Sequence, residues 1–229
     1  MNFAGLASDI DCREGIILID KPLGLSSFGV VARVRRLLGV KKVGHTGTLD
    51  PLATGLLIVL VGKATKRCTE FIADGKVYRA CICLGSNTSG DDREGNVTKR
   101  WHYEHIDETH IREILPLFLG AQLQTPPIFS AKKINGIPCH RKARAGICLC
   151  PPPQKINIYR IDFCRYQAPL LEVEIECSKG TYVRAVARDI GTKLGCGAHI
   201  HNLRRTQSGN FSVQNAISLV EVAKHTHIQ

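Results

Sequence analysis

A twelve-residue run rich in glycine and small polar side chains, Gly44 to Gly55, leads directly into the apolar segment Leu56 to Val61. A continuous apolar segment of this length is typical of a strand that is buried on both faces. Pro51 disfavours helical backbone at the preceding residue, Asp50, so this carboxylate is expected on a stiff turn. This succession of a glycine-rich run and an apolar segment predicts a well-ordered functional loop that is anchored by a core strand.

Asp50 is the only acidic residue between Asp20 and Glu70. The cationic residues around it in the sequence are Arg33, Arg35, Arg36, Lys41, Lys42, Lys63, Lys66 and Arg67. A lone carboxylate in a basic environment is a candidate for catalysis. The alternative is a purely structural turn, since Asp-Pro commonly opens a turn in which the Asp side chain bonds its own backbone. Spacing alone leaves both interpretations open.

The overall charge narrows the class of partner. The 229 residues include 31 Lys and Arg against 20 Asp and Glu, which gives a formal net charge of +11. Such an excess favours a polyanion, because clustered cations attract phosphates and release their counterions. No apolar run approaches the length of a membrane-spanning helix, and residues 1–15 lack a hydrophobic signal core. We therefore expect a cytoplasmic protein that binds nucleic acid and no membrane.

Ten cysteines raise the question of a metal site. The sequence contains no C-x-x-C pair, and the two C-x-C pairs, Cys81/Cys83 and Cys148/Cys150, have no partner pair at zinc-site spacing. In a reducing compartment free cysteine behaves as a small buried hydrophobe. We expect spare thiols and no bound metal.

Hydrophobic periodicity predicts the main elements. Strands are predicted over 15–20, 56–61, 76–84, 155–163 and 171–177. Helices are predicted from the Ser26-Ser27 cap to Gly39, within 101–119, from about Val183 to Gly195, and within 214–229. A polar loop is predicted from Gly85 to Glu94. The basic segment from Lys132 to Gly146 has five Lys and Arg and no acid, so it is either a solvated turn or, as the overall charge also suggests, a phosphate-binding surface.

Several motifs together resemble one family. The run from Gly44 to Gly55 is similar to the catalytic motif of the TruB-type tRNA pseudouridine synthases, G-H-[TS]-G-x-L-D-P-x-A-[TS]-G, and matches it at every fixed position. Ser178-Lys179-Gly180-Thr181-Tyr182-Val183-Arg184 resembles the second signature of that family, S-K-G-T-Y-[IV]-R. Further similarity lies in Asp20-Lys21-Pro22, Tyr78-Arg79, the stretch 124–146 and the stretch 195–209. Within 124–146 the chain departs from the family pattern at Phe129, where Tyr is usual, and at His140.

The resemblance implies a fold and a domain plan. It implies an α/β (α+β) protein with the pseudouridine synthase fold, in which a central mixed, mainly antiparallel sheet is flanked by helices and RNA-binding loops. Residues 1–14 would be an N-terminal extension, and residues 15–213 the catalytic domain, with a basic RNA-binding insert at about 124–150. Residues 214–229 would form a short C-terminal helix, with no PUA domain.

The resemblance also implies a reaction and its residues. The implied activity is the isomerisation of uridine 55 in the T loop of tRNA to pseudouridine, with Asp50 as the catalytic carboxylate and Tyr78 and Arg184 in the active site. His45 would fill the space left by the flipped base, and Tyr182 and Leu203 would line the pocket. The RNA would be bound by Lys21, Lys66, Lys132, Lys133 and Arg144.

The implied reaction requires no cofactor, because it neither adds nor oxidises atoms. Whether Asp50 attacks C1′ or C6 stays open. Leu52-Ala53 after Asp-Pro resembles the bacterial stand-alone enzymes, so we expect no guide RNA. Without a PUA domain, the basic residues between Lys21 and Arg205 would supply nearly all phosphate contacts, so the T-arm stem-loop of tRNA should suffice as substrate. We also expect a monomer. Two alternatives remain, a non-catalytic tRNA-folding chaperone and a pseudouridine synthase that acts on another RNA.

Overall fold

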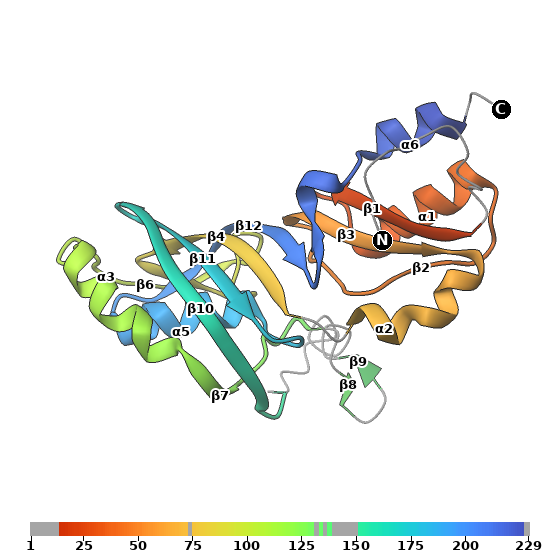
Figure 1. The fold of residues 1–229 in the computed structure, drawn as a ribbon. Helices are drawn as coiled ribbons and strands as arrows, with labels where there is room; N and C mark the ends of the chain where they lie inside the picture. The colour runs from red at the N-terminus through yellow and green to blue at the C-terminus, as the bar shows by residue number, and fades with distance from the viewer. Residues whose placement is uncertain (1–13, 73–74, 131–132, 135–136, 139–150, 227–229) are drawn as a thin grey trace. The chain divides into compact units, whose positions relative to one another are not determined.

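The computed structural model describes residues 14–72, 75–130, 133–134, 137–138 and 151–226 (Figure 1). The chain divides into two compact units, the first formed by residues 1–74 and 206–229 and the second by residues 75–205. Within the described residues, no helix is long and apolar enough to cross a membrane. Each unit is considered by itself below.

The first unit is built on strand β3, which carries the apolar segment singled out in the sequence. Strands β1 and β2 both pair with β3 antiparallel, and Val59 lies opposite Ile17 in β1 and opposite His45 in β2. The elements of this unit are β1 (Gly15–Lys21), α1 (Ser27–Leu38), β2 (Val43–His45), β3 (Ala53–Val61), η1 (Gly62–Arg67), α2 (Cys68–Ile72), β13 (Phe211–Ser212), η3 (Val213–Asn215) and α6 (Leu219–Thr226).

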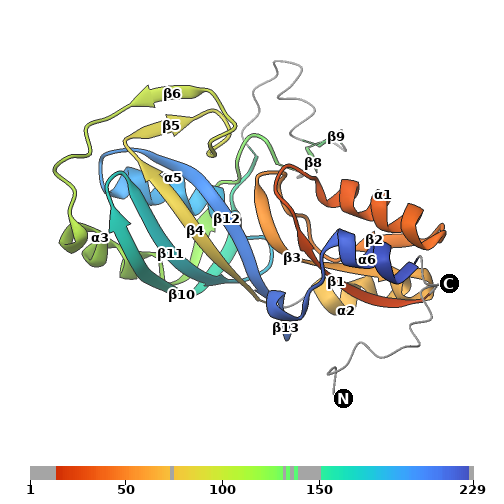
Figure 2. The same cartoon turned by 90° about the horizontal axis from the view of Figure 1, so that it is seen from above.

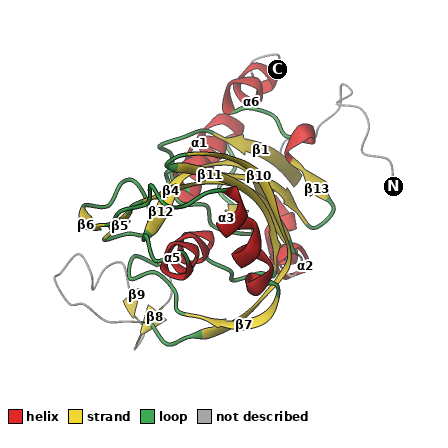
Figure 3. Cartoon of the chain, turned by 90° about the vertical axis from the view of Figure 1, so that its left-hand side faces the viewer, coloured by secondary structure: helices red, strands yellow, loops and turns green. Residues whose placement is uncertain are grey.

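Both faces of β3 are buried, as the continuous apolar run predicts. Leu57, Val59 and Val61 pack with buried residues of α1, β1 and α6, and α1 and α6 lie side by side (Figure 3). Leu56, Ile58 and Leu60 form a separate cluster with apolar residues that include Phe71 and Phe211. Alternate side chains of one strand therefore enter two different apolar layers.

Helix α1 begins and ends as predicted, but its two serines have different roles. The Ser26 side chain accepts a hydrogen bond from Gly29 N at 3.0 Å and is the N-cap, while Gly39 ends the helix with φ 64°. Ser27 is instead the first residue of the helix and is buried. Its hydroxyl is therefore available for a contact outside the helix.

The second unit contains a mainly antiparallel sheet. Its strand order is β12-β4-β11-β10-β7, in which β11 is antiparallel to β4 and β10 is antiparallel to both β11 and β7. Its elements are β4 (Lys76–Leu84), β5 (Ser86–Thr88), β6 (Val97–Arg100), α3 (Glu108–Ile114), η2 (Leu115–Phe118), β7 (Gly120–Gln124), β8 (Lys133–Ile134), β9 (Ile137–Pro138), β10 (Gln154–Gln167), β11 (Leu170–Cys177), α5 (Val183–Lys193) and β12 (Ala198–Ser208), whose last residues continue into the first unit.

Helix α5 packs on β4 and on the start of β12 (Figure 2). A Cβ at Gly191 would lie 2.2 Å from the backbone nitrogen of Ala198, so only glycine permits this approach. Buried residues Ala185, Val186 and Ile190 line the apolar face of α5. In β11, Leu171, Val173 and Ile175 are buried while Glu172 is exposed, which confirms the predicted alternation.

The predicted fold class, a mixed and mainly antiparallel sheet with flanking helices, is confirmed. The polar loop predicted from Gly85 to Glu94 is partly wrong, since Ser86–Thr88 forms β5 and pairs with β6. Strands β7 and β12 were not predicted, because their sequences show no clean alternation. Helix α3 is shorter than the predicted span 101–119 and begins at an Asp107 capping box.

Candidate active site

The peptide unit on the N-terminal side of Asp50 is fixed by a buried serine. Ser27 Oγ accepts a hydrogen bond from Leu49 N at 2.8 Å and donates one to Leu49 O at 3.0 Å. Ser27 and Leu49 are only 2% and 3% exposed. The backbone polar groups of Leu49 are thus satisfied by one side chain from α1, which links the loop to the helix.

The C-terminal side of Asp50 is fixed as well. Lys21 is fully buried, and its ammonium donates to Pro22 O at 3.0 Å, to Leu25 O at 2.5 Å and to Pro51 O at 3.3 Å. Pro51 O also accepts from Gly24 N at 2.8 Å, and Asp50 O accepts from Ala53 N at 3.0 Å. The half-buried Asp50 therefore lies on a turn that is held from both sides.

Lys21 was predicted to bind an RNA phosphate, but in this structure its side chain has no exposed surface. A buried ammonium needs hydrogen-bond acceptors, and the three backbone carbonyls supply them. The family resemblance implied a cation that reaches a phosphate, whereas the residues after Lys21 fold over its ammonium and present carbonyl oxygens to it. Its contacts are those of a positioning residue for the Asp50 loop.

The other predicted residues of the first unit lie close to this loop in sequence. His45 is the last residue of β2, is half-buried, and accepts a weak hydrogen bond from the Cys68 thiol on its backbone oxygen, with 3.6 Å between the sulfur and the oxygen. Lys66 is exposed in η1. An exposed lysine retains its hydration and mobility, so Lys66 has the surface that Lys21 lacks.

The remaining predicted pocket residues belong to the second unit. Tyr78 lies in β4 opposite Ile175 and is 8% exposed, and Leu203 lies in β12 and is 7% exposed. Tyr182 stands just before α5, where Gln124 holds its backbone: Tyr182 N donates to Gln124 Oε1 at 2.8 Å, and Gln124 Nε2 donates to Tyr182 O at 3.1 Å. This reciprocal pair joins the end of β7 to the start of α5.

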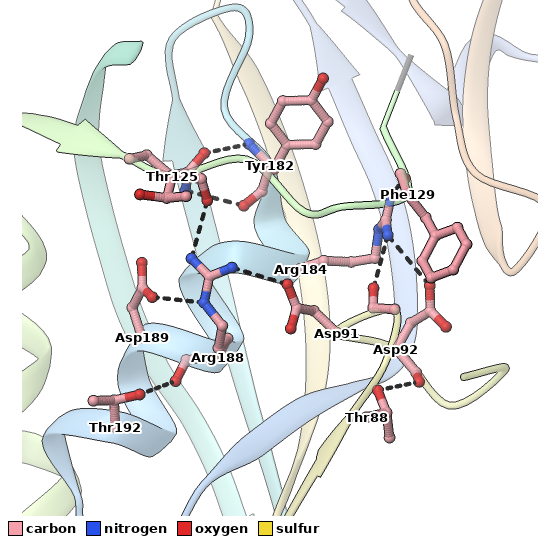
Figure 4. Close-up of polar contacts among 12 residues, drawn as sticks. Thr88, Asp91, Asp92, Thr125, Phe129, Tyr182, Arg184, Arg188, Asp189 and Thr192 are labelled. Atoms are coloured by element: carbon pink, nitrogen blue, oxygen red, sulfur yellow. Dashed lines mark hydrogen bonds and ion pairs between the residues drawn. The ribbon is translucent and has the colours of Figure 1, made fainter. Parts of the chain in front are cut away.

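Arg184, in the first turn of α5, is 4% exposed and is held by backbone oxygens (Figure 4). Its Nη1 donates to Gly90 O at 2.8 Å, and its Nη2 donates to Phe129 O at 3.0 Å. The Asp92 carboxylate lies 3.6 Å from Nη1. Phe129 participates through its carbonyl group, so its departure from the family pattern leaves this contact intact.

The loop that supplies Gly90 and Asp92 is itself ordered by local bonds. Thr88 Oγ1 donates to Asp92 O at 2.6 Å, and an Asp92 carboxylate oxygen accepts from Glu94 N at 3.0 Å. Asp91 has φ 58°, a left-handed conformation in which Asp is one of the tolerated residues. Arg93 N donates to Ile200 O, which fixes the loop to β12.

Sequence reasoning missed Ser27, Gln124 and Asp92 as parts of the site. Ser27 was assigned only to helix capping, and Asp92 was placed in an unstructured polar loop. A usable signal was the Asp91-Asp92 pair between Gly90 and Gly95 in a chain with few acids. Nothing in the sequence indicated that Gln124 would bond both polar backbone groups of Tyr182.

Three predicted RNA-binding residues belong to the segment 131–150, of which the structure describes little. Lys132 and Arg144 lie outside the described residues, and so do most of the predicted insert and His140. Lys133 begins the short strand β8, of which only the backbone is described. Their roles stay predictions.

The described cysteines are free thiols: Cys68, Cys81, Cys83, Cys164, Cys177 and Cys196. Burial raises the pKa of Cys177 and, together with the negative charge of Glu172, the pKa of Cys81, each to about 11. Protonated thiols are poor nucleophiles and poor metal ligands. Within the part of the chain that the structure describes, no three His, Cys, Asp or Glu residues are grouped as metal ligands.

Comparison with known proteins relates this fold and site to one class. The structure of a Cbf5-Nop10-Gar1 complex contains a chain that matches with a TM-score of 0.74 and 28% identity over 95% of this chain. The archaeal box H/ACA sRNP Nop10-Cbf5 complex matches with a TM-score of 0.70 and 27% identity. This chain spans only 56% and 55% of the lengths of those two chains. The chain therefore has the pseudouridine synthase fold that its motifs implied, and the motif-bearing loop lies in the first unit.

The particular family follows from sequence. Residues 35–183 match the N-terminal domain of the TruB family of pseudouridylate synthases, and residues 184–229 match the C-terminal domain of tRNA pseudouridylate synthase B. The tRNA pseudouridine synthase B of Bordetella avium is 45% identical over 208 residues, which are 90% of this chain and 85% of that protein. The enzyme of the same name from Desulfotalea psychrophila is 45% identical over 218 residues, 93% of this chain and 89% of that protein. The chain belongs to the TruB family of tRNA pseudouridine synthases, as the motifs predicted.

Proposed function

We propose that this chain isomerises uridine 55 in the T loop of tRNA to pseudouridine, with Asp50 supplying the carboxylate that the reaction requires. The observation that carries the proposal is the restraint on Asp50. Ser27 holds the peptide before it and Lys21 the peptide after it, and both supporting side chains are buried. A carboxylate that is already oriented loses little freedom when it meets the substrate. Membership of the TruB family supports the tRNA substrate.

The chemistry is an internal rearrangement. The bond between N1 and C1′ breaks, the base turns, C5 bonds to C1′, the proton on C5 is lost and N1 gains a proton. Asp50 acts as a nucleophile on either C1′ or C6, so that one difficult step is divided into two. The balance of atoms and electrons calls for no cofactor or metal.

The remaining roles in the proposal follow from what each side chain offers. A uridine inside folded tRNA must leave its stack before it reacts, and His45 fills the space that it leaves. Tyr78 presents an aromatic ring to the extruded base, while Tyr182 and Leu203 line the pocket and Arg184 stabilises negative charge. Phosphates are held by the basic side chains Lys66, Lys132, Lys133 and Arg144.

We further propose the conditions under which the enzyme acts. The T-arm stem-loop supplies the RNA contacts that binding and catalysis require. The protein works in the cytoplasm as a monomer without a guide RNA. The net charge of +11 supports an RNA partner bound largely through phosphates. The proposed monomer differs in this respect from the two solved structures, which are complexes of Cbf5 with other proteins.

The experiment compares wild type with Asp50→Asn on unmodified tRNA, measuring pseudouridine formation and tRNA binding side by side. Asparagine keeps the size and shape of the side chain but removes its negative charge, so we expect turnover to disappear while affinity stays within about twofold. Glu70→Gln is the matched control, because Glu70 is an exposed acid of the same unit that pairs with its neighbour Arg67.

Turnover by Asp50→Asn at a rate near that of wild type would refute the assignment of Asp50. Tight tRNA binding by the wild-type protein without any pseudouridine formation would instead favour the chaperone alternative. Pseudouridine at positions other than 55, or only in other RNAs, would refute the proposed substrate.

A further inference from the structure

Arg188 lies one helical turn after Arg184 on α5 and is not among the residues that the family motifs indicated. Its guanidinium uses all three nitrogens (Figure 4). Nη1 pairs with Asp91 Oδ2, Nε pairs with Asp189 Oδ1, and Nη2 donates to Thr125 O, each at 3.0 Å. Only 24% of its side chain is exposed.

These contacts join three segments that are far apart in the sequence. Asp91 belongs to the loop between β5 and β6, Thr125 follows β7, and Arg188 lies in α5. The same loop presents Gly90 O and the Asp92 carboxylate to Arg184, and the residue before Thr125 is Gln124, which holds the Tyr182 backbone. Arg188 therefore contacts the immediate chain neighbours of the groups that fix Arg184 and Tyr182.

The backbone conformation of Asp91 indicates that its contact with Arg188 is needed to hold the loop between β5 and β6. Asp91 has φ 58°, which is unfavourable for most residues with a side chain, so surrounding contacts must hold it in place. Burial also raises the pKa of the Asp91 carboxyl, although the charges of Arg188 and Arg184 oppose that rise. A carboxylate in such a site is retained only with a charged partner, and Arg188 is the partner at 3.0 Å.

We propose that Arg188 is a positioning residue that holds the Asp91 loop and the end of β7 against α5, so that the Arg184 guanidinium and Tyr182 keep the orientation needed for pseudouridine formation. This inference rests on the proposed function, since it gives Arg184 a part in the reaction. Arg188 touches no reacting atom in it. Its effect should fall on the chemical step and leave RNA binding in place.

The test measures the single-turnover rate constant for pseudouridine formation in tRNA and, separately, the Kd for tRNA. For Arg188→Gln and for Asp91→Asn we expect the rate constant to fall by about tenfold or more, and Kd to stay within about twofold of wild type. Arg188→Lys keeps one charge but not the three-way fork, so it should recover only part of the rate. Lys193→Gln, an exposed charge loss on the same helix, should match wild type.

A double variant, Arg188→Gln with Asp91→Asn, shows whether the two substitutions slow the reaction by breaking the same contact or by unrelated effects on the structure. If both variants act through the same pair, the double variant should be no slower than the slower single variant. Multiplying losses, a wild-type rate constant in Arg188→Gln, or a Kd that rises in step with the loss of rate would each overturn the proposal. If Arg188→Gln does not fold, Asp91→Asn decides alone, because Asn fits the same space and tolerates the left-handed backbone; a wild-type rate constant in that variant overturns the proposal.

Asp50→Asn in the same assay keeps the two proposals distinguishable. An inactive Asp50→Asn beside a fully active Arg188→Gln refutes only the role of Arg188. An active Asp50→Asn refutes the proposed mechanism, whatever Arg188 does.

Discussion

Replacing Ser27 with alanine tests how the Asp50 loop is held. The hydroxyl satisfies both the N–H and the C=O of Leu49, and both residues are buried. Alanine leaves those two groups without the serine, and a buried unsatisfied polar group costs about 1–3 kcal/mol. The two groups together cost about 2–6 kcal/mol, and for a protein of this size about 1 kcal/mol lowers Tm by roughly 2–4 °C, so we expect a decrease of roughly 4–24 °C.

The catalytic effect should be larger than stability alone explains. Leu49 precedes Asp50, so a peptide released from Ser27 changes the direction of the carboxylate. Small misplacements of a reacting group cost up to about a hundredfold in rate, and we expect Ser27→Ala to lose between about tenfold and a hundredfold in kcat.

Ser26→Ala is the matched control, because it removes the neighbouring hydroxyl. Ser26 caps α1 through Gly29 N, and losing such a cap costs about 1 kcal/mol without touching Leu49. Thermal melts and steady-state kinetics on tRNA compare the two variants. Equal kcat values for Ser26→Ala and Ser27→Ala, at similar losses of Tm, would refute the positioning of Asp50 by Ser27.

Three further outcomes are expected. Lys21→Met should keep the buried volume but leave the Pro22, Leu25 and Pro51 carbonyls without the ammonium. We therefore expect Tm and kcat to fall while the affinity for tRNA changes by less than about twofold. A rise in Kd with unchanged kcat would instead support a phosphate-binding role for Lys21. The isolated T-arm stem-loop should be modified with a kcat/KM within about tenfold of full tRNA and with a similar salt slope, and a hundredfold preference for full tRNA would contradict this. The pKa of Cys81 is raised to about 11, and only the thiolate reacts with an alkylating agent. The rate of Cys81 alkylation, followed by mass spectrometry, should therefore rise by about tenfold per pH unit from neutral pH upward. A rate that levels off near pH 9 would contradict the raised pKa.

Local sequence signals were sufficient for much of the fold. The apolar run of β3, the alternation of β11 and the apolar stripe of α5 each predicted an element that the structure contains. Strands β7 and β12 were not predicted, because their conformation depends on pairing with neighbouring strands and not on an alternation of apolar and polar residues in their own sequences. The β5–β6 hairpin escaped for the same reason, since β6 is exposed along its whole length and has no apolar face.

The candidate site shows a similar division between local and long-range information. Composition singled out Asp50 as a candidate, and the resemblance to the family's second signature added Tyr182 and Arg184. The partners that orient them lie far away in sequence: Ser27 bonds Leu49 across 22 residues, Gln124 bonds Tyr182 across 58, and Arg184 bonds Gly90 across 94. Such pairings depend on the register of the fold, which a single sequence does not contain.

Lys21 and Arg188 show why charge alone is a weak guide to RNA contacts in this chain. Both belong to a strongly basic protein, and composition favours phosphates as their partners. Yet Lys21 has its ammonium surrounded by carbonyl oxygens, and Arg188 has its guanidinium shared among Asp91, Asp189 and Thr125. A cation with its donors already satisfied gains little from a phosphate and would leave buried oxygens unpaired by turning to one. In each unit, therefore, we propose that a cation whose donors are already bonded orients the backbone near a proposed catalytic residue, and that phosphates are bound by exposed cations such as Lys66.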